Sequence, residues 1–210
     1  MHRQRGNNHN REIIAISVLL FIFFWMLVGI YYYPPLKKFD YTVNNYLKSI
    51  HSRFLTAFMI FITDLGAWGV AFAGTVAAVA LAMKRKWYLL TVWICAHLGA
   101  VALNETIKAI IGRPRPPLPH LVHVTTFSYP SGHALVSMAA YGLMSYYLTL
   151  WSCTKTFKPL FITLWIILFT SIGFSRMYLQ VHYFSDVIAG YSIGAAWLIV
   201  CVAWVKKATN

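Results

Sequence analysis

The chain has 210 residues, of which 59% are hydrophobic and only 11% are charged. About a quarter of the residues are charged in soluble domains, so this composition excludes an ordinary soluble globular protein. Eighteen Lys and Arg residues against five acids give a formal net charge of +13, which we assign to membrane topology and an anionic ligand rather than to a nucleic-acid partner.

Uncharged segments of membrane-spanning length recur along the chain. A helix needs about 20 apolar residues to cross the hydrocarbon core of a bilayer. Six segments come close to that length, at 13–33, 65–83, 87–104, 134–154, 159–175 and 187–205. They predict an all-α, polytopic membrane protein whose six transmembrane helices form a single domain over residues 1–210. A soluble helical protein would need polar faces on these helices, and such faces are mostly missing.

The short connections between alternate segments are dense in Lys and Arg. With a cytoplasmic tail at residues 1–12, the other inner segments are 84–86, 155–158 and 206–210. The positive-inside bias is weak over the whole chain, but these inner segments are so short that their basic density is high. We therefore expect a cell-membrane protein with both termini in the cytoplasm.

The segment that follows the first predicted span, residues 33–54, mixes polar and apolar residues at helical spacing. Two interpretations are equally favoured: a helix along the outer membrane surface whose lysines attract anionic lipids, or a solvated loop. Asp64 comes next, in "FITDLGAWG". We expect Asp64 to be buried and to support the structure, either by holding a cation of the site or by capping a helix.

Polar residues interrupt the end of the third predicted span. His97, Asn104, Glu105 and Lys108 recur at seven, eight and eleven residues, so we expect them on one helical face. Mutual hydrogen bonds are the favoured explanation for His97 and Asn104, with Asn104 and Glu105 both within reach of Lys108. Polar groups at membrane depth usually face the interior of a helix bundle or a wet cavity.

Lys108 stands apart because Arg113 and Arg115 follow it closely. Three cations on the outer side, opposite the basic inner segments, indicate a bound anion. The Pro-rich, irregular loop that begins here also contains His120 and His123. We interpret these two histidines as ordinary loop residues rather than as substrate contacts.

The sequence "YPSGHA" stands directly before the fourth predicted span. Pro130 suits the first turn of a helix, and Ser131 and Gly132 leave the backbone N–H groups approachable. A helix N-terminus of this kind binds phosphate, and the Ser131 hydroxyl adds a donor. His133 could exchange a proton there near neutral pH. Taken alone, the pattern fits a plain helix cap with an incidental histidine equally well.

A third cluster joins the fifth and sixth predicted spans. Arg176 can hold a phosphate through two N–H groups. His182 and Asp186 are four residues apart, so in a helix the carboxylate could accept a hydrogen bond from one imidazole nitrogen and leave the other free as a nucleophile. Because the spans alternate in direction, we expect all three clusters to converge at the outer membrane face and to form a phosphoryl-transfer site.

The acidic residues argue against a metal at this site, and we expect no cofactor. The chain has five of them, Glu12, Asp40, Asp64, Glu105 and Asp186, and they are widely separated in the sequence. Magnesium and calcium need several oxygen ligands in one place. We therefore expect the cations to provide the charge stabilisation that a metal would otherwise supply. Three cysteines, Cys95, Cys153 and Cys201, lack metal-ligand spacing and are interpreted as unpaired and reduced.

The three clusters together resemble the type 2 phosphatidic acid phosphatase superfamily, the lipid phosphate phosphatases. The family pattern is Lys-x6-Arg-Pro, then Pro-Ser-Gly-His, then Ser-Arg-x5-His-x3-Asp, and residues 108–186 match it at every position. Arg113 begins a second Arg-Pro, but only Arg115 has the family spacing from Lys108.

The resemblance implies a role for each matched residue. His182 would attack phosphorus and form a phosphohistidine, Asp186 would orient His182, and His133 would protonate the leaving oxygen and then help to activate water. The phosphoryl oxygens would be held by Lys108, Arg115, Ser131, Gly132 and Arg176.

The resemblance also implies a substrate in the bilayer: undecaprenyl diphosphate, phosphatidylglycerophosphate or phosphatidic acid. Two alternatives stay open. The protein could be a lipid phosphotransferase that passes the phosphoryl group to another lipid, or a non-catalytic protein that binds or transports phospholipid.

Overall fold

The computed structural model describes residues 18, 22, 34–117, 119–151 and 157–209. Within this part of the chain every regular element is a helix, so the all-α prediction is confirmed. The helices are α2 (Pro34–Ser49), α3 (Arg53–Asp64), α4 (Val70–Met83), α5 (Trp87–Ile111), α6 (Gly132–Trp151), α7 (Phe157–Tyr178) and α8 (Phe184–Thr209). A π-helical turn, Leu65–Gly69, joins α3 to α4 without a break.

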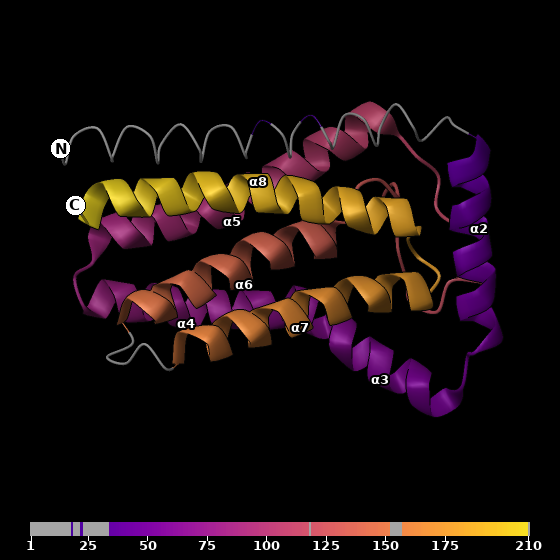
Figure 1. The fold of residues 1–210 in the computed structure, drawn as a ribbon, viewed down its shortest axis with the longest axis horizontal. Helices are drawn as coiled ribbons and strands as arrows, with labels where there is room; N and C mark the ends of the chain where they lie inside the picture. The colour runs from indigo at the N-terminus through magenta and orange to yellow at the C-terminus, as the bar shows by residue number, and fades with distance from the viewer. Residues whose placement is uncertain (1–17, 19–21, 23–33, 118, 152–156, 210) are drawn as a thin grey trace.

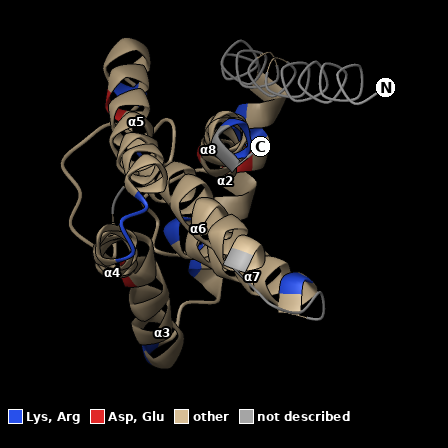
Figure 2. Ribbon diagram, turned by 90° about the vertical axis from the view of Figure 1, so that its left-hand side faces the viewer, with Lys and Arg blue, Asp and Glu red and all other residues tan. Residues whose placement is uncertain are grey.

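Four of the described helical stretches are long and apolar enough to cross a membrane: Arg53–Met83, Trp87–Ile111, Phe157–Tyr178 and Phe184–Lys207. They contain the second, third, fifth and sixth predicted spans. The first predicted span lies outside the described residues. The fourth corresponds to α6, which runs through the centre of the bundle and contacts α4, α5, α7 and α8 (Figure 2).

All four stretches are longer than the predicted spans, and the second and third differ most. The second begins at Arg53 rather than at Leu65, because the π-helical turn keeps the backbone helical through Asp64. The third continues past Asn104 to Ile111. It ends at Gly112, whose φ of 60° allows its N–H to bond the Lys108 carbonyl and close the helix. Lys108 therefore lies on the helix itself.

Close packing of α8 on α6 depends on two glycines four residues apart, Gly190 and Gly194. A Cβ atom on Gly190 would lie 2.6 Å from the Ser131 carbonyl oxygen, and one on Gly194 would lie 2.6 Å from the Leu135 carbonyl oxygen. Small residues at this spacing let two membrane helices approach backbone to backbone. The contact fixes the N-terminal half of α8 against the start of α6.

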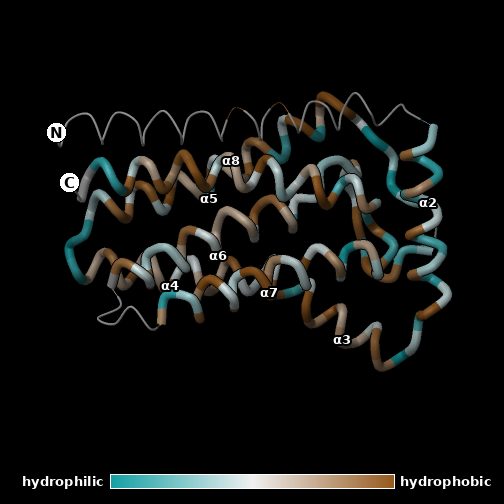
Figure 3. Tube along the Cα trace, in the orientation of Figure 1, coloured by the Kyte–Doolittle hydropathy of each residue, from teal (hydrophilic) through white to brown (hydrophobic). Residues whose placement is uncertain are grey.

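Buried aromatic side chains add hydrogen bonds between helices. Trp93 Nε1 donates to the Gly74 carbonyl at 3.0 Å, and Trp197 Nε1 donates to the Ala96 carbonyl at 2.9 Å. Tyr147 is buried and donates to the Leu89 carbonyl at 2.9 Å. These bonds satisfy ring N–H and O–H groups among the hydrophobic segments that Figure 3 shows in brown.

The bundle has two different ends. The C-terminal ends of α5 and α7 and the N-terminal ends of α6 and α8 meet at one end, and α2 lies across it (Figure 1). The α4–α5 turn and the C-terminal end of α8 lie at the other, where Figure 2 shows basic residues in blue. The fold therefore brings the three predicted clusters together.

Residues 34–49 form a helix, so the helical interpretation of this segment is the one that the structure shows. Its buried positions include two polar residues, Asp40 and Asn44. Aromatic residues on the same helix, Phe39, Tyr41 and Tyr46, are exposed. The usual amphipathic arrangement is thus partly reversed, because α2 turns polar groups toward the end of the bundle where the three clusters meet.

Candidate active site

A cavity of about 670 Å³ opens where the three clusters meet, among the start of α4, the end of α5, the start of α6 and the end of α7. Six of the eight predicted site residues line it: Lys108, Arg115, Gly132, His133, Arg176 and His182. The other two, Ser131 and Asp186, are completely buried behind its wall.

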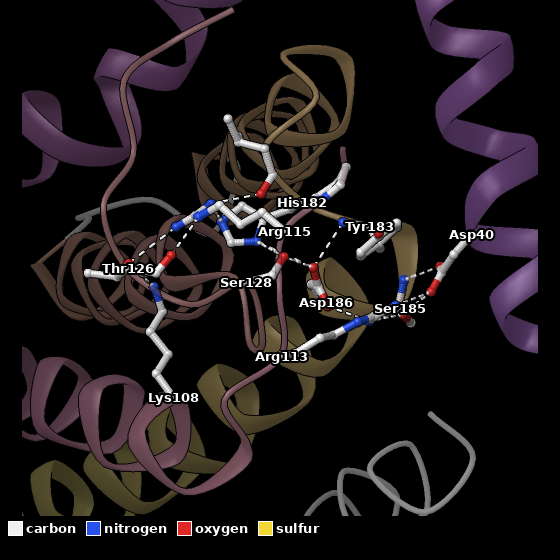
Figure 4. Close-up of polar contacts among 12 residues, drawn as sticks. Asp40, Lys108, Arg113, Arg115, Thr126, Ser128, His182, Tyr183, Ser185 and Asp186 are labelled. Carbon is white, nitrogen blue, oxygen red and sulfur yellow. Dashed lines mark hydrogen bonds and ion pairs between the residues drawn. The ribbon is translucent and has the colours of Figure 1, made fainter. Parts of the chain in front are cut away.

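His182 lies in the short connection between α7 and α8, two residues before α8 begins. Its Nδ1 atom is 3.5 Å from Asp186 Oδ2, and its Nε2 atom is 3.3 Å from Arg115 Nη1 (Figure 4). A guanidinium can only donate hydrogen bonds, so Nε2 carries the lone pair and Nδ1 carries the proton. The predicted His–Asp pairing is present, although His182 itself is not helical.

His182 is neutral at neutral pH. Its burial, together with the cations Arg176, Arg115 and Lys108, holds the pKa of its imidazole well below the usual value. The unprotonated Nε2 is therefore available as a nucleophile, which is the form that attack on an electrophile requires.

Asp186, in the first turn of α8, has hydrogen-bond donors on both carboxylate oxygens. Oδ2 accepts from Ser128 Oγ at 2.5 Å and from the Tyr183 N–H at 2.9 Å. Oδ1 accepts from Arg113 Nη1 at 2.5 Å. Ser128 Oγ also lies 3.5 Å from His182 Nδ1. The carboxylate is thus fixed in place beside the imidazole.

Arg113 and Ser128 are functional candidates that sequence reasoning missed. The repeated Arg-Pro drew attention to Arg113, but the family spacing assigned only Arg115. Arg113 is buried and also donates to Asp40 Oδ2 of α2, at 2.8 Å. Asp40 and Asp186 are far apart in the sequence, yet they lie close together in the fold, because both bind the same guanidinium.

The three cations of the cavity bind neutral oxygen atoms. Lys108 Nζ donates to Thr126 Oγ1 at 2.9 Å, and Arg115 Nε donates to the Thr126 carbonyl at 2.7 Å. Arg176 Nη1 donates to Thr63 Oγ1 at 2.8 Å, and its buried Nε has no hydrogen-bond partner in the described part of the chain. These contacts orient the cations without neutralising them, so their charge stays available to an anion.

The start of α6 differs in detail from the prediction. The helix begins at Gly132, so Pro130 precedes it instead of occupying its first turn. The Ser131 N–H is not approachable, because it donates to the Asp186 carbonyl at 3.0 Å. Gly132 and His133 lie in the first turn, where amide groups have no acceptor within the helix, and both line the cavity. Ser131 Oγ is buried and has no hydrogen-bond partner among the described residues.

The polar residues of α5 share one face, as predicted, since His97, Asn104, Glu105 and Lys108 all line the cavity. Their hydrogen bonds are only partly the expected ones. Asn104 Nδ2 donates to Glu105 Oε1 at 2.6 Å, and His97 Nδ1 lies 2.9 Å from the Trp93 carbonyl oxygen. Lys108 instead binds the loop, through Thr126.

Three other residues with predicted roles lie at or near the cavity. Asp64 lines it and is exposed, so the expectation that Asp64 is buried is wrong. His123 also lines the cavity, which the interpretation as an ordinary loop residue did not foresee. His120 does not line it, and its Nε2 lies 2.7 Å from the Pro116 carbonyl oxygen.

The chain is similar to known proteins over most of its length. The PAP2 superfamily model matches residues 86–210. Phosphatidylglycerophosphatase B of Bacillus subtilis (strain 168) is 30% identical over 181 residues, which are 84% of this chain and 88% of that protein. Lipid A 4'-phosphatase of Bacteroides thetaiotaomicron is 27% identical over 186 residues, which cover 80% of this chain and 78% of that protein.

Solved structures are similar as well. The crystal structure of a transmembrane PAP2 type phosphatidylglycerolphosphate phosphatase from Bacillus subtilis matches with a TM-score of 0.86 at 25% identity, over 91% of this chain and 96% of that one. LpxE of Aquifex aeolicus matches with a TM-score of 0.60 at 22% identity, over 79% of this chain and 93% of that one, which shows a likeness of fold alone.

Proposed function

The chain belongs to the PAP2 superfamily and is a membrane lipid phosphatase, and from this premise we propose that it hydrolyses a lipid phosphate or diphosphate through a phosphohistidine at His182. The observation that carries the proposal is the cavity itself. The neutral imidazole of His182 and three cations, Lys108, Arg115 and Arg176, all line it. Its volume is large enough for a phosphorylated headgroup.

The proposed reaction has two steps. In the first, the Nε2 lone pair of His182 forms a bond to phosphorus while the bond from phosphorus to the lipid oxygen breaks, and His133 gives a proton to that oxygen. In the second, His133 takes a proton from water, the water oxygen attacks phosphorus, and the N–P bond breaks to release inorganic phosphate and restore His182. Asp186 holds Nδ1–H in both steps and stabilises the positive ring.

Charge on the transferring phosphoryl group would be stabilised by Lys108, Arg115 and Arg176, together with the Gly132 N–H at the start of α6. The neutral hydrogen-bond partners of the three cations support this assignment. Ser131 Oγ, which is buried with no partner among the described residues, would donate to a phosphoryl oxygen that enters this far.

The substrate is proposed to be a lipid because the cavity extends along the membrane-spanning stretches. Its walls include Val70 and Ala71 of α4 and His97 and Val101 of α5, so the rest of the substrate can stay in the bilayer while its phosphate reaches His182. Undecaprenyl diphosphate, phosphatidylglycerophosphate and phosphatidic acid are the proposed candidates. The names of the relatives, which include a phosphatidylglycerophosphatase and a lipid A 4'-phosphatase, support this class.

We further propose a single six-span domain over residues 1–210 in the cell membrane, with cytoplasmic termini and a site that faces outside. The density of basic residues at the end of the bundle away from the cavity supports this orientation.

The test is phosphate release by the purified protein in detergent with EDTA present. Each of the three lipids and a soluble phosphomonoester would be assayed with the wild type and with His182→Ala. We expect release that depends on His182 and survives EDTA. Loss of activity that magnesium restores would contradict the proposed mechanism. Transfer of the phosphoryl group to another lipid without release of phosphate would favour a phosphotransferase. No turnover of any lipid would favour a binding or transport protein.

A further inference from the structure

Two buried residues outside the family pattern, Asp40 on α2 and Arg113 in the loop after α5, are tied to Asp186. We propose that both are positioning residues. Asp40 offsets the positive charge of Arg113, so that the cluster of Asp40, Arg113 and Asp186 keeps one net negative charge beside His182. This inference rests on the proposed function, in which His182 becomes positively charged during the reaction.

The contacts form one continuous chain of charged groups. Arg113 Nη2 donates to Asp40 Oδ2 at 2.8 Å, and Arg113 Nη1 donates to Asp186 Oδ1 at 2.5 Å. Asp186 Oδ2 lies 3.5 Å from His182 Nδ1. Figure 4 shows these groups in sequence, from Asp40 on α2 through Arg113 to Asp186 and His182.

Solvent does not screen these charged groups, because their side chains are buried. The exposed fractions of the side chains are 1% for Asp40, 3% for Arg113 and 0% for Asp186. Arg113 also lies over the ring of Tyr183, with its Cζ atom 4.2 Å from the ring centroid. In such surroundings a charge must be balanced by a partner, and removing one partner leaves the other exposed to the full cost of burial.

The charges decide what Asp40 contributes. Asp40, Arg113 and Asp186 together carry one net negative charge. Without Asp40, the guanidinium would neutralise Asp186 completely, and the cluster would offer no net charge to His182. A positively charged phosphohistidine ring would then lose its counter-charge. Without Arg113, two carboxylates would face one another, and His182 would be driven toward its protonated form, which cannot attack phosphorus.

Asp40 also anchors the helix that carries Asp186. Asp40 Oδ1 accepts from the Ser185 N–H at 3.0 Å, and Oδ2 accepts from Ser185 Oγ at 2.5 Å. Ser185 lies in the first turn of α8, where N–H groups lack helical partners. A purely structural role for Asp40 is therefore the explanation that an experiment has to separate from charge balance.

Three variants separate the two explanations: Asp40→Asn, Arg113→Gln and the double variant. Asp40→Asn leaves the cluster neutral, and Arg113→Gln leaves it with two negative charges. The double variant restores one net negative charge, on Asp186 alone. Charge balance therefore predicts that the double variant is more active than either single variant, whereas a structural role predicts that the two losses accumulate.

The measurement is kcat and KM for the lipid phosphate that the wild type hydrolyses fastest, with His182→Ala in the same series. We expect Asp40→Asn to lower kcat by roughly tenfold or more, the size typical of an outer partner of a functional group, with KM little changed. Thr42→Val, at an exposed position on the same helix, is the matched control and should behave as the wild type.

Each result bears on a different claim. Recovery of kcat in the double variant supports the inference. Wild-type kcat in Asp40→Asn, or a double variant with the combined loss of both single variants, overturns it while the phosphatase proposal stands. If Asp40→Asn does not fold, as judged by gel filtration and thermal unfolding, a folded and active double variant still supports charge balance, and an inactive or unfolded one overturns it. No hydrolysis by the wild type would overturn the proposed function and the inference with it.

Discussion

The cations at the site differ in what their side chains contact. Arg113 lies between two carboxylates and belongs to the support of His182. Lys108, Arg115 and Arg176 bind hydroxyl and carbonyl oxygens, which hold them in position and leave their charge for a ligand. At the scale of single residues, this difference separates groups that would touch a phosphate from groups that position the nucleophile.

Removing a cavity cation should therefore slow turnover. We expect Lys108→Ala and Arg176→Ala each to lower kcat by about 100-fold or more, the loss typical of deleting one donor that stabilises transition-state charge. Steady-state phosphate release measures the effect. Lys38→Ala, which removes an exposed cation from α2, should leave kcat unchanged. Wild-type turnover in both cavity variants would remove Lys108 and Arg176 from the site.

The neutrality of His182 should also appear in the stability of the protein. An unfolded histidine has a pKa of about 6.5, and burial and nearby cations hold the folded pKa of His182 well below that value. Between the two values the unfolded state binds more protons, so the free energy of unfolding falls as the pH drops below the unfolded pKa.

Lowering the pH from about 7.5 to about 5.5 should thus reduce the unfolding midpoint of the wild type more than that of His182→Gln. Thermal unfolding in detergent, followed by intrinsic tryptophan fluorescence, measures both shifts. Equal shifts in the two proteins would mean that the pKa of His182 is not lowered in the folded state.

At the scale of helices, the contact between α6 and α8 sets the distance between two proposed functional residues. These are His133 on α6, the proposed acid and base, and Asp186 on α8, which holds His182. Gly194→Ala should destabilise the fold by about 1–3 kcal/mol, the usual cost of overpacking, because the new Cβ would meet the Leu135 carbonyl oxygen at 2.6 Å. A backbone atom cannot rotate away from the methyl group.

Gly74→Ala is the matched control for this prediction. A Cβ on Gly74 would lie 3.4 Å from the nearest atom, His97 Nε2, which is an ordinary contact. Thermal unfolding of both variants in the same detergent compares them directly. Equal stability of Gly194→Ala and Gly74→Ala would show that α6 and α8 can separate without cost.

Helix positions followed from the sequence more closely than helix ends did. Uncharged runs at 65–83, 87–104, 159–175 and 187–205 each lie within one of the four described helical stretches. Their extensions were hidden because Asn104, Glu105 and Lys108 interrupt the apolar pattern, although the helix continues and turns them toward a cavity. Asp64 hid the junction of α3 and α4 in the same way.

At the scale of the whole molecule, the basic α4–α5 turn lies at one end of the bundle (Figures 1 and 2), and the cations that line the cavity lie toward the other, where α5 and α7 end. If the positive-inside rule orients this protein, Lys84 faces the cytoplasm and Pro119, in the loop beside the cavity, faces outside. We expect a membrane-impermeant maleimide to label Pro119→Cys, but not Lys84→Cys, in intact cells. Both substitutions would be made in a protein without Cys95, Cys153 and Cys201, and the opposite labelling would reverse the orientation.

Six of the residues that the sequence motifs predicted line one cavity. They could be predicted because the motifs combine residue types that bind and transfer phosphate. The contact of Asp40 with Arg113 could not be predicted in this way, since the two residues are 73 positions apart and neither belongs to a periodic pattern. Only the folded chain shows that α2 closes the end of the bundle with a carboxylate.

The most direct test of the whole account is to trap the phosphoenzyme. The wild type, His133→Ala and His182→Ala would be mixed briefly with the preferred lipid phosphate, quenched in base, which preserves phosphohistidine, and digested for mass spectrometry. The account predicts phosphate on His182 in the wild type and none in His182→Ala. In His133→Ala it predicts that the phosphoenzyme both forms and decays more slowly, because His133 is the acid of the first step and the base of the second. Hydrolysis without a phosphorylated His182, or phosphate on another residue, would contradict it.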